Sequence, residues 1–268
     1  MNPLLLASGA SPRFALRRLS RKLNPAPKLD TLIVDVDRTL TTEDSPKAAL
    51  ERLCGKSEAK KLMDGFIRAA IKGDIPLDGL HGEVFRALYE RGFKPSDWGA
   101  LMEEFGRSGA FRTDLVDTIH QIAERERLRV VVATRSSLTG AQWIASRFGF
   151  GHAVGSVEYP HNGGFSGFRT VIGVRDNAVN GTRFMTKMSA TAELLSQAGI
   201  PFSPSRAAVI SNDLLDALEM LDSALGVLVV PRERNTLEKI TLALRLYDVK
   251  IPVEDARYAL PAVFGIEN

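Results

Sequence analysis

Apolar residues occur along the chain in short unbroken runs that are separated by longer stretches with helical spacing. The runs cover residues 31–36, 129–134, 206–211 and 225–231, and we interpret each as a buried strand. Buried strands that alternate with helices are typical of a parallel sheet covered on both faces. The pattern therefore predicts an α/β fold with a Rossmann-like parallel sheet as its core.

Helical spacing dominates the region between the first two runs. Apolar residues recur every three or four positions in segments 58–73, 78–92 and 95–106, and each segment ends near a glycine. A shorter helix is predicted from Ser45, which is placed to cap it, with Pro46 in its first turn. Further helices are predicted over 113–126, 138–149, 186–199 and 213–221, and the sequence "PHNGG" indicates a hairpin between 153–159 and 164–174.

Composition and charge narrow the class of protein. With 44% apolar and 25% charged residues among 268, the chain can bury a sizeable core. Its only cysteine, Cys54, excludes an intramolecular disulfide and a cysteine-based metal site, which fits a cytoplasmic protein. Residues 1–29 hold six of the 35 basic residues and no acid, so the remainder carries a net charge of −3. We therefore expect no nucleic-acid partner.

The basic segment 1–29 precedes the first predicted strand, and three interpretations of it are open. It is a mobile solvated tail, an organelle import signal, or a short amphipathic helix over residues 14–23 that contacts a membrane or a protein. The tail is the simplest of the three. The "NPAP" that follows indicates a linker.

Polar side chains follow three of the predicted strands. Because parallel strands bring their carboxyl ends to one edge of a sheet, where ligands bind in such folds, we expect these side chains to converge. They are Asp35 and Asp37 after the first strand, Thr134 after the second, and Asn212, Asp213 and Asp216 after the third.

Four segments in this order resemble the motifs of the haloacid dehalogenase (HAD) superfamily of phosphohydrolases. They are "DVDRTLT" (35–41), "VVVATRSS" (130–137), "TKMSATAELL" (186–195) and "VISNDLLDALEML" (209–221). The match covers about residues 30–232 and is most similar to the phosphoserine-phosphatase-like branch. It implies a core of residues 30–44 and 113–268, with residues 45–112 as an inserted all-helical cap.

The resemblance also implies an activity, the hydrolysis of a small phosphorylated metabolite with Mg²⁺ as cofactor. Asp35 would be the nucleophile that forms an aspartyl-phosphate, and Asp37 would be the general acid and base. Thr134 and Lys187 would hold the phosphoryl oxygens. The implied metal ligands are Asp35, Asp37, Asn212, Asp213 and Asp216.

The chain departs from the motifs at three places. Arg38 follows the second carboxylate where many members have glycine, and it is a candidate for substrate contact, as are Arg135 and Ser136 in the second motif. Asn212 takes a position where an acid normally binds the metal, which removes one negative charge. In the cap, Asp44 or Glu43 would meet a substrate amine or cap the following helix, and we favour capping.

Three other classes of protein are alternatives to a phosphatase. Receiver domains are smaller, and their phosphorylated aspartate does not follow the first core strand. True dehalogenases lack the second carboxylate. The strongest alternative is an inactive HAD-fold pseudophosphatase that serves as a binding or scaffold protein, which Asn212 and the altered second motif would favour.

Overall fold

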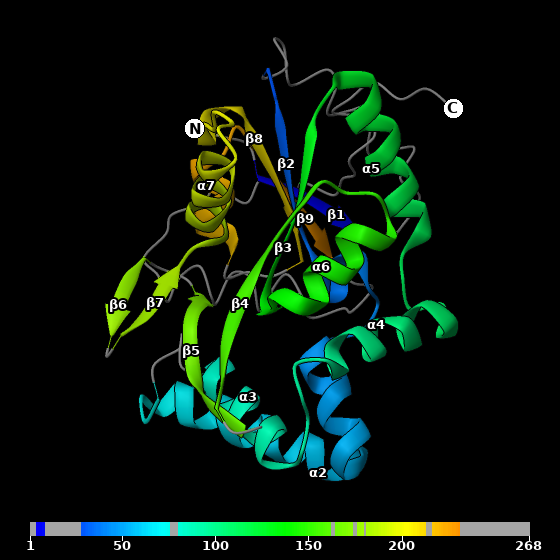
Figure 1. The fold of residues 1–268 in the computed structure, drawn as a ribbon. Coiled ribbons are helices and arrows are strands. Elements are labelled where there is room, and N and C mark those ends of the chain that lie inside the picture. Colours follow the sequence, from blue (N-terminus) through cyan, green and yellow to red (C-terminus); the bar gives the residue numbers. More distant parts are fainter. Residues whose placement is uncertain are drawn as a thin grey trace.

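A computed structural model of the chain describes residues 4–8, 28–75, 80–161, 164–173, 176–179, 181–212 and 216–230. Within these residues, nine strands form one sheet in the order β1-β9-β8-β2-β3-β4-β5-β7-β6 (Figure 1). The strands are β1 (Leu4–Ser8), β2 (Thr31–Asp35), β3 (Arg129–Ser137), β4 (His152–His161), β5 (Gly164–Ile172), β6 (Asn177–Val179), β7 (Thr182–Met185), β8 (Ala207–Ser211) and β9 (Leu225–Val230). The first six strands in the order are parallel, so the predicted α/β fold is confirmed.

Seven α-helices are described, and three of them fall within the predicted insertion at residues 45–112. These three are α2 (Ser45–Lys72), α3 (Leu80–Glu90) and α4 (Asp97–Ser108). The others are α5 (Thr113–Glu126), α6 (Leu138–Arg147), α7 (Lys187–Gln197) and α8 (Ala217–Asp222). Figure 1 shows α2 and α3 beyond the lower ends of β4 and β5, away from the central strands.

Alternation along the central strands divides the core into two layers, because successive side chains of a strand point to opposite faces. Leu32 and Val34 of β2 belong to the hydrophobic cluster that includes α5 and α6. Ile33, between them, belongs to a second cluster, which includes Met188 of α7 and Met220 of α8. Both faces of the sheet are therefore covered, as a continuous apolar strand requires.

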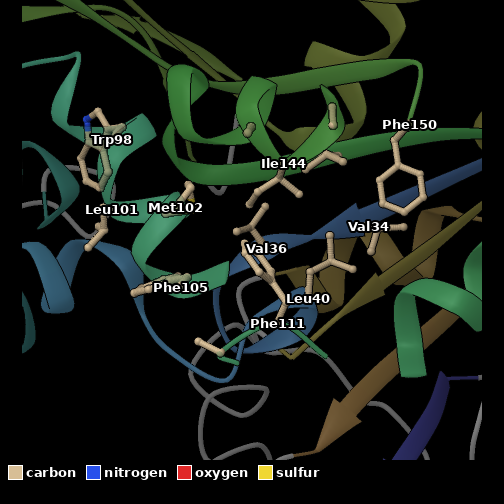
Figure 2. Close-up of a cluster of buried hydrophobic side chains, with 14 of the residues drawn as sticks. Val34, Val36, Leu40, Trp98, Leu101, Met102, Phe105, Phe111, Ile144 and Phe150 are labelled. Carbon is tan, nitrogen blue, oxygen red and sulfur yellow. The ribbon is translucent and has the colours of Figure 1, made fainter. Parts of the chain in front are cut away.

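The last inserted helix, α4, shares the core of the sheet (Figure 2). One cluster of buried side chains runs from β2 and the turn after it to α4 and α6. Its labelled members are Val34, Val36, Leu40, Trp98, Leu101, Met102, Phe105, Phe111, Ile144 and Phe150. Helix α4 is therefore attached to the core by apolar packing.

The β4–β5 hairpin links α3 and α4 to the sheet. Phe85 of α3 packs edge to face on Phe168 of β5, with ring centroids 5.0 Å apart. The carboxylate of Glu158 on β4 accepts hydrogen bonds from Trp98 Nε1 at 3.1 Å and from the Tyr89 hydroxyl at 3.3 Å. Burial raises the pKa of Glu158, because these donors are neutral and leave its charge uncompensated.

Helix α2 replaces two helices that the sequence predicted separately. Gly55 has a φ of 80°, so the two segments meet at a kink where glycine adopts a left-handed conformation. The N-cap is Asp44 and not Ser45, because the Asp44 carboxylate accepts from the Lys47 N–H at 3.0 Å. The capping role favoured for the acids before this helix is thus confirmed for Asp44.

The N-terminal extension contributes a strand that the sequence did not predict. Strand β1 pairs in parallel with β9, from Leu4 opposite Gly226 to Ser8 opposite Val230. The amphipathic helix predicted over residues 14–23 lies outside the described residues. Of the helices that are described, none is long and apolar enough to cross a membrane.

A close backbone contact at Gly155 holds β4 against the beginning of α6. A Cβ atom at Gly155 would lie 2.7 Å from both the N and the Cα of Leu138, and 3.0 Å from the carbonyl carbon of Ser137. Backbone atoms cannot move aside as the end of a side chain can. Gly155 therefore sets the position of the second motif, which ends at Ser137.

We predict that Gly155→Ala lowers the free energy of unfolding by roughly 2 kcal/mol, as overpacking against rigid neighbours does. Urea unfolding measures this change. Gly65→Ala in α2 is the matched control, because nothing lies within 4 Å of its added Cβ. Removing a helical glycine should raise stability there by up to about 1 kcal/mol. Equal effects at the two positions would contradict the assignment.

Candidate active site

The polar ends of β2, β3 and β8 meet at one edge of the sheet. Asp35 pairs in register with Ala133, so Thr134 lies one residue beyond it on β3. Val34 pairs with Ile210, which brings Ser211 beside Asp35 on the other side. The expected convergence of these strand ends is therefore present in the structure.

Lys187 opens α7 and directs its ammonium group at the end of β2. Its Nζ lies 2.5 Å from Asp35 Oδ1, and its side chain is only 1% exposed. Thr186 caps the helix, since its hydroxyl accepts from the Ser189 N–H at 3.1 Å. Residues 152 positions apart in the sequence thus form a buried ion pair.

Asp216, which the resemblance implied as a metal ligand, contacts two cations in this structure. One carboxylate oxygen lies 2.5 Å from Lys187 Nζ, and the other lies 2.5 Å from the guanidinium of Arg135. Burial alone would raise the pKa of Asp216, but Arg135 and Lys187 outweigh it and hold this pKa at about 2. With both oxygens in ion pairs, Asp216 serves to hold the two cations.

Arg135 was a candidate for substrate contact, and the structure turns its side chain inward. Its guanidinium is 5% exposed and lies against Asp216 and, at 3.9 Å, Glu219. The Arg135 carbonyl accepts from the Ser156 hydroxyl at 2.7 Å, which fixes the backbone of this segment. Arg135 is therefore part of the internal charge network.

Asp37 is held by the start of α2 and by the second motif. Its Oδ1 accepts from the Ser45 N–H at 2.6 Å, and its Oδ2 accepts from the Thr134 hydroxyl at 3.3 Å. Burial, followed by the charges of Asp44 and Asp35, raises the pKa of Asp37 from 3.8 to about 7. A carboxyl group with such a pKa can both give and take a proton near neutral pH.

Thr134 was predicted to hold phosphoryl oxygens, and in the structure its hydroxyl is directed at Asp37. The same hydroxyl oxygen accepts from the Ser136 N–H at 3.0 Å. Ser136, a candidate for substrate contact, is buried, and its own hydroxyl lies 3.2 Å from that of Ser45. The second motif therefore orients Asp37 and the start of α2.

Thr39 joins the end of β2 to the segment after β8. Its hydroxyl lies 2.8 Å from Asp35 Oδ2 and 3.1 Å from Asn212 Oδ1, and it accepts from the Asn212 N–H at 2.8 Å. Asp35 and Asn212 thus place one side-chain oxygen each around the same atom. Thr39 was not predicted as a site residue, although it lies within the first motif, "DVDRTLT" (35–41).

Arg38 lies at the surface of the site in a strained conformation. Its φ of 60° is left-handed, which is unfavourable for a residue with a Cβ atom. Its N–H donates to the Glu43 carbonyl at 3.0 Å, and its guanidinium lies 3.8 Å from Asp44. The side chain is about half exposed, so Arg38 can reach a molecule at the site.

The oxygen ligands that Mg²⁺ prefers are present around Asp35. They are the Asp35 carboxylate and the Asn212 amide oxygen, which both lie beside the Thr39 hydroxyl, and only the first of these two ligands is charged. No group of three or more His, Cys, Asp or Glu side chains among the described residues is placed to hold a metal. The predicted ligand Asp213 lies outside them. Two such ligands are compatible with Mg²⁺, which keeps several of its own water molecules in protein sites.

Several solved structures share this fold at low sequence identity. A HAD family hydrolase from Salmonella enterica subsp. enterica serovar Typhi has a TM-score of 0.61 at 13% identity, over 86% of this chain and 75% of that one. A protein of unknown function from Bordetella pertussis Tohama I has 0.57 at 15%, over 83% and 97%. An apo phosphoserine phosphatase has 0.51 at 13%, over 79% and 98%.

The chain has the fold of the HAD hydrolases. The expectation for the fold that came from the four motifs is therefore confirmed. The sequence matches no family model and no curated protein. Likeness to the HAD fold fixes where a site would lie, at the carboxyl ends of the central strands, where Asp35 and Lys187 meet.

The raised pKa of Asp37 predicts a pH-dependent effect on stability. Because its folded-state pKa lies above its value of 3.8 in the unfolded chain, ionised Asp37 destabilises the folded protein, increasingly so up to about pH 7. In metal-free buffer, the stabilising effect of Asp37→Asn should therefore grow by on the order of 2 kcal/mol between pH 5 and pH 8. Urea unfolding at the two pH values measures it.

The control for this experiment is Asp117→Asn on α5, where the carboxylate is exposed. Its effect on unfolding should be the same at both pH values. If the effect of Asp37→Asn were equally independent of pH, the assignment of a raised pKa to Asp37 would be wrong.

Proposed function

We propose that this protein is a phosphatase that hydrolyses a small phosphorylated metabolite through an aspartyl-phosphate on Asp35. One observation carries the proposal: Asp35 is paired with the buried Lys187, beside a second carboxyl group whose pKa is about 7. A nucleophile, a fixed cation and a group that exchanges protons near neutral pH are what phosphoryl transfer needs.

The first chemical step would be attack by the Asp35 carboxylate on phosphorus. A bond forms between Asp35 and phosphorus while the ester bond breaks, and Asp37 gives its proton to the departing alkoxide. Lys187 would stabilise the charge that develops on the phosphoryl oxygens. Because its ammonium group is already held between two carboxylates, this cation needs little rearrangement.

The second step would release phosphate and restore the enzyme. Asp37, now ionised, takes a proton from a water molecule that attacks the aspartyl-phosphate, and the bond between Asp35 and phosphorus breaks. The hydrogen bond from Thr134 to Asp37 would keep the carboxylate in place during both transfers. The nearby Ser45 N–H also stabilises its charged form.

A magnesium ion is the proposed cofactor. The Asp35 carboxylate, the Asp37 carbonyl and the Asn212 amide oxygen would hold it, with Asp213 as the remaining candidate. When bound, Mg²⁺ neutralises charge on the phosphate group. Asn212 contributes no charge, so most of the affinity would depend on Asp35 and on the substrate.

Residues 45–112 would act as the cap that encloses a small substrate. Helices α2 and α3 extend beyond the sheet, and α2 starts beside Asp37 through its Ser45 N–H. The half-exposed Arg38 would contact the part of the substrate that leaves. A cap over the site would exclude bulk water during the reaction.

A second candidate function is that of a pseudophosphatase that binds a partner without catalysis. Two observations favour it: an uncharged amide at Asn212, and the ion pair of Arg135 with Asp216. Both reduce the negative charge available to a metal ion. The intact pair of Asp35 and Lys187, with Asp37 beside it, favours catalysis.

The proposed function predicts metal-dependent turnover of an aryl phosphate such as p-nitrophenyl phosphate. Turnover should occur with Mg²⁺, stop on addition of EDTA, and fall by at least about 1000-fold in Asp35→Asn, which removes the nucleophile. Release of nitrophenolate measures it, and Asp117→Asn, far from the site in sequence and exposed, is the matched control. Activity that survives in Asp35→Asn would contradict the proposed nucleophile.

A second prediction concerns the affinity for the metal. Asn212→Asp would place a second carboxylate beside Asp35, and the added negative charge should tighten Mg²⁺ binding by about tenfold or more in the absence of substrate. Calorimetric titration with Mg²⁺ measures the change. An unchanged or weaker affinity would remove Asn212 from the ligand set and direct attention to Asp213.

A further inference from the structure

A buried glutamate outside the proposed catalytic set contacts the beginning of α7. Glu219, on α8, is 5% exposed. Its Oε1 accepts from the Lys187 N–H at 3.2 Å, and its Oε2 accepts from the Met188 N–H at 2.6 Å. Both carboxylate oxygens of Glu219 are therefore engaged by the backbone of the first two residues of α7.

These contacts satisfy donors that a helix cannot satisfy internally. The first N–H groups of an α-helix have no partner within the helix, and an acceptor there also benefits from the helix dipole. In α7, the third N–H, that of Ser189, is taken by Thr186. Glu219 takes the two before it, so the whole first turn of α7 is held by side chains.

The same segment of α8 also holds the other end of Lys187. Asp216, three residues before Glu219, lies 2.5 Å from Lys187 Nζ. Asp216 and Glu219 thus contact Lys187 at its ammonium group and at its main chain. We call these two acids the α8 clamp. A lysine side chain has many rotamers, and fixing both of its ends restricts the ammonium group to the position 2.5 Å from Asp35.

Arg135 makes the α8 clamp compatible with burial. Two acids one helical turn apart repel each other, and the desolvation of Glu219 is costly. The guanidinium of Arg135 lies 2.5 Å from Asp216 and 3.9 Å from Glu219, so it offsets charge on both. Acids and cations therefore alternate from Asp35 through Lys187, Asp216 and Arg135 to Glu219.

We propose that Glu219 is a positioning residue, which fixes the Lys187 ammonium group against Asp35 by holding the first turn of α7. The expected effect of Glu219 on the reaction rate rests on the phosphatase activity proposed above. Glu219 touches neither the nucleophile nor the proton donor, and it acts through Lys187 alone. It contributes to the rate by pre-organising the cation that stabilises the developing charge.

The test replaces the carboxylate by an amide. Glu219→Gln can accept only one of the two hydrogen bonds, because its NH₂ group cannot accept. We expect kcat to fall by about 10- to 100-fold, the usual cost of a small misplacement of a catalytic group, with KM changed by less than about threefold. Hydrolysis of p-nitrophenyl phosphate with Mg²⁺ gives both constants.

The matched control is Glu193→Gln, the same substitution on α7, the helix whose first turn Glu219 contacts. Glu193 forms an exposed ion pair with Arg183 at 2.6 Å, so its loss should leave kcat and KM unchanged. Should Glu219→Gln fail to fold, Glu219→Asp keeps the charge but is too short to reach both N–H groups. It should show the same selective loss of kcat, and full activity in Glu219→Asp would overturn the proposal.

A double-mutant cycle separates positioning from a general structural effect. In a Lys187→Ala background there is no ammonium group to position, so Glu219→Gln should change the remaining rate by less than about twofold. An equal loss of kcat in the presence and absence of the Lys187 side chain would show that Glu219 does not act through it.

A spectroscopic measurement keeps the proposal separate from the phosphatase activity. The ¹H–¹⁵N signal of the Lys187 ammonium group, assigned with Lys187→Arg, should shift or broaden in Glu219→Gln and stay unchanged in Glu193→Gln. If the wild-type chain did not hydrolyse phosphate esters but this shift were present, positioning would stand and the proposed function would fall. If the wild-type chain is active, but Glu219→Gln changes neither the Lys187 signal nor kcat, the positioning role is overturned.

Discussion

One ammonium group, that of Lys187, is shared by two buried carboxylates. Removing charges from water costs several kcal/mol for each ion, and the attraction between them repays this only at close range and in good geometry. Lys187 Nζ lies 2.5 Å from an oxygen of both Asp35 and Asp216. The carboxyl end of β2, the first turn of α7 and the start of α8 must therefore meet within a few ångströms, which the parallel pairing of β8 and β2 allows.

The same edge of the sheet sets the pKa values of two of its carboxyl groups far apart. Arg135 and Lys187 hold the pKa of Asp216 at about 2 despite its burial, whereas burial and neighbouring acids raise the pKa of Asp37 to about 7. Divergent environments of this kind separate a permanently charged group from one that exchanges protons. Asp216 is suited to hold cations, and Asp37 is suited to proton transfer.

The sequence predicted the central architecture because the strands that build it are continuous apolar runs. Four such runs correspond to β2, β3, β8 and β9, and polar residues mark the carboxyl ends of the first three. The short strands β6 and β7 were missed, since their mixed composition carries no periodic signal. Strand β1 is a short apolar run, LLLAS, inside the basic extension, for which no strand was predicted. The merging of two predicted helices at Gly55 follows from its left-handed φ, which a kink accommodates without ending the helical course.

The direction of individual side chains was the part that sequence could not give. Arg135 follows Thr134 in the second motif and was predicted as a candidate for substrate contact, yet its guanidinium lies against Asp216. That position is decided by an acid 81 residues further along the chain. Glu219 was not predicted as a site residue because its partners are main-chain N–H groups. Every residue except proline has such a group, so the sequence does not indicate which of them a side chain will contact.

The charge balance of this network bears on how an anion would be accepted at the site. Among the described residues, the buried cations at this edge are Lys187 and Arg135, and Arg135 is already paired with Asp216. They face Asp35, Asp216 and Glu219, and burial raises the pKa of Glu219 to about 7. A phosphate monoester carries up to two further negative charges into a region from which water is largely excluded. It must then draw Lys187 away from a carboxylate or arrive with a cation of its own. In the function proposed above, the neutral amide of Asn212 would leave Asp35 as the charged ligand and would favour the second course, in which phosphate and metal ion bind together and each makes the other's binding favourable.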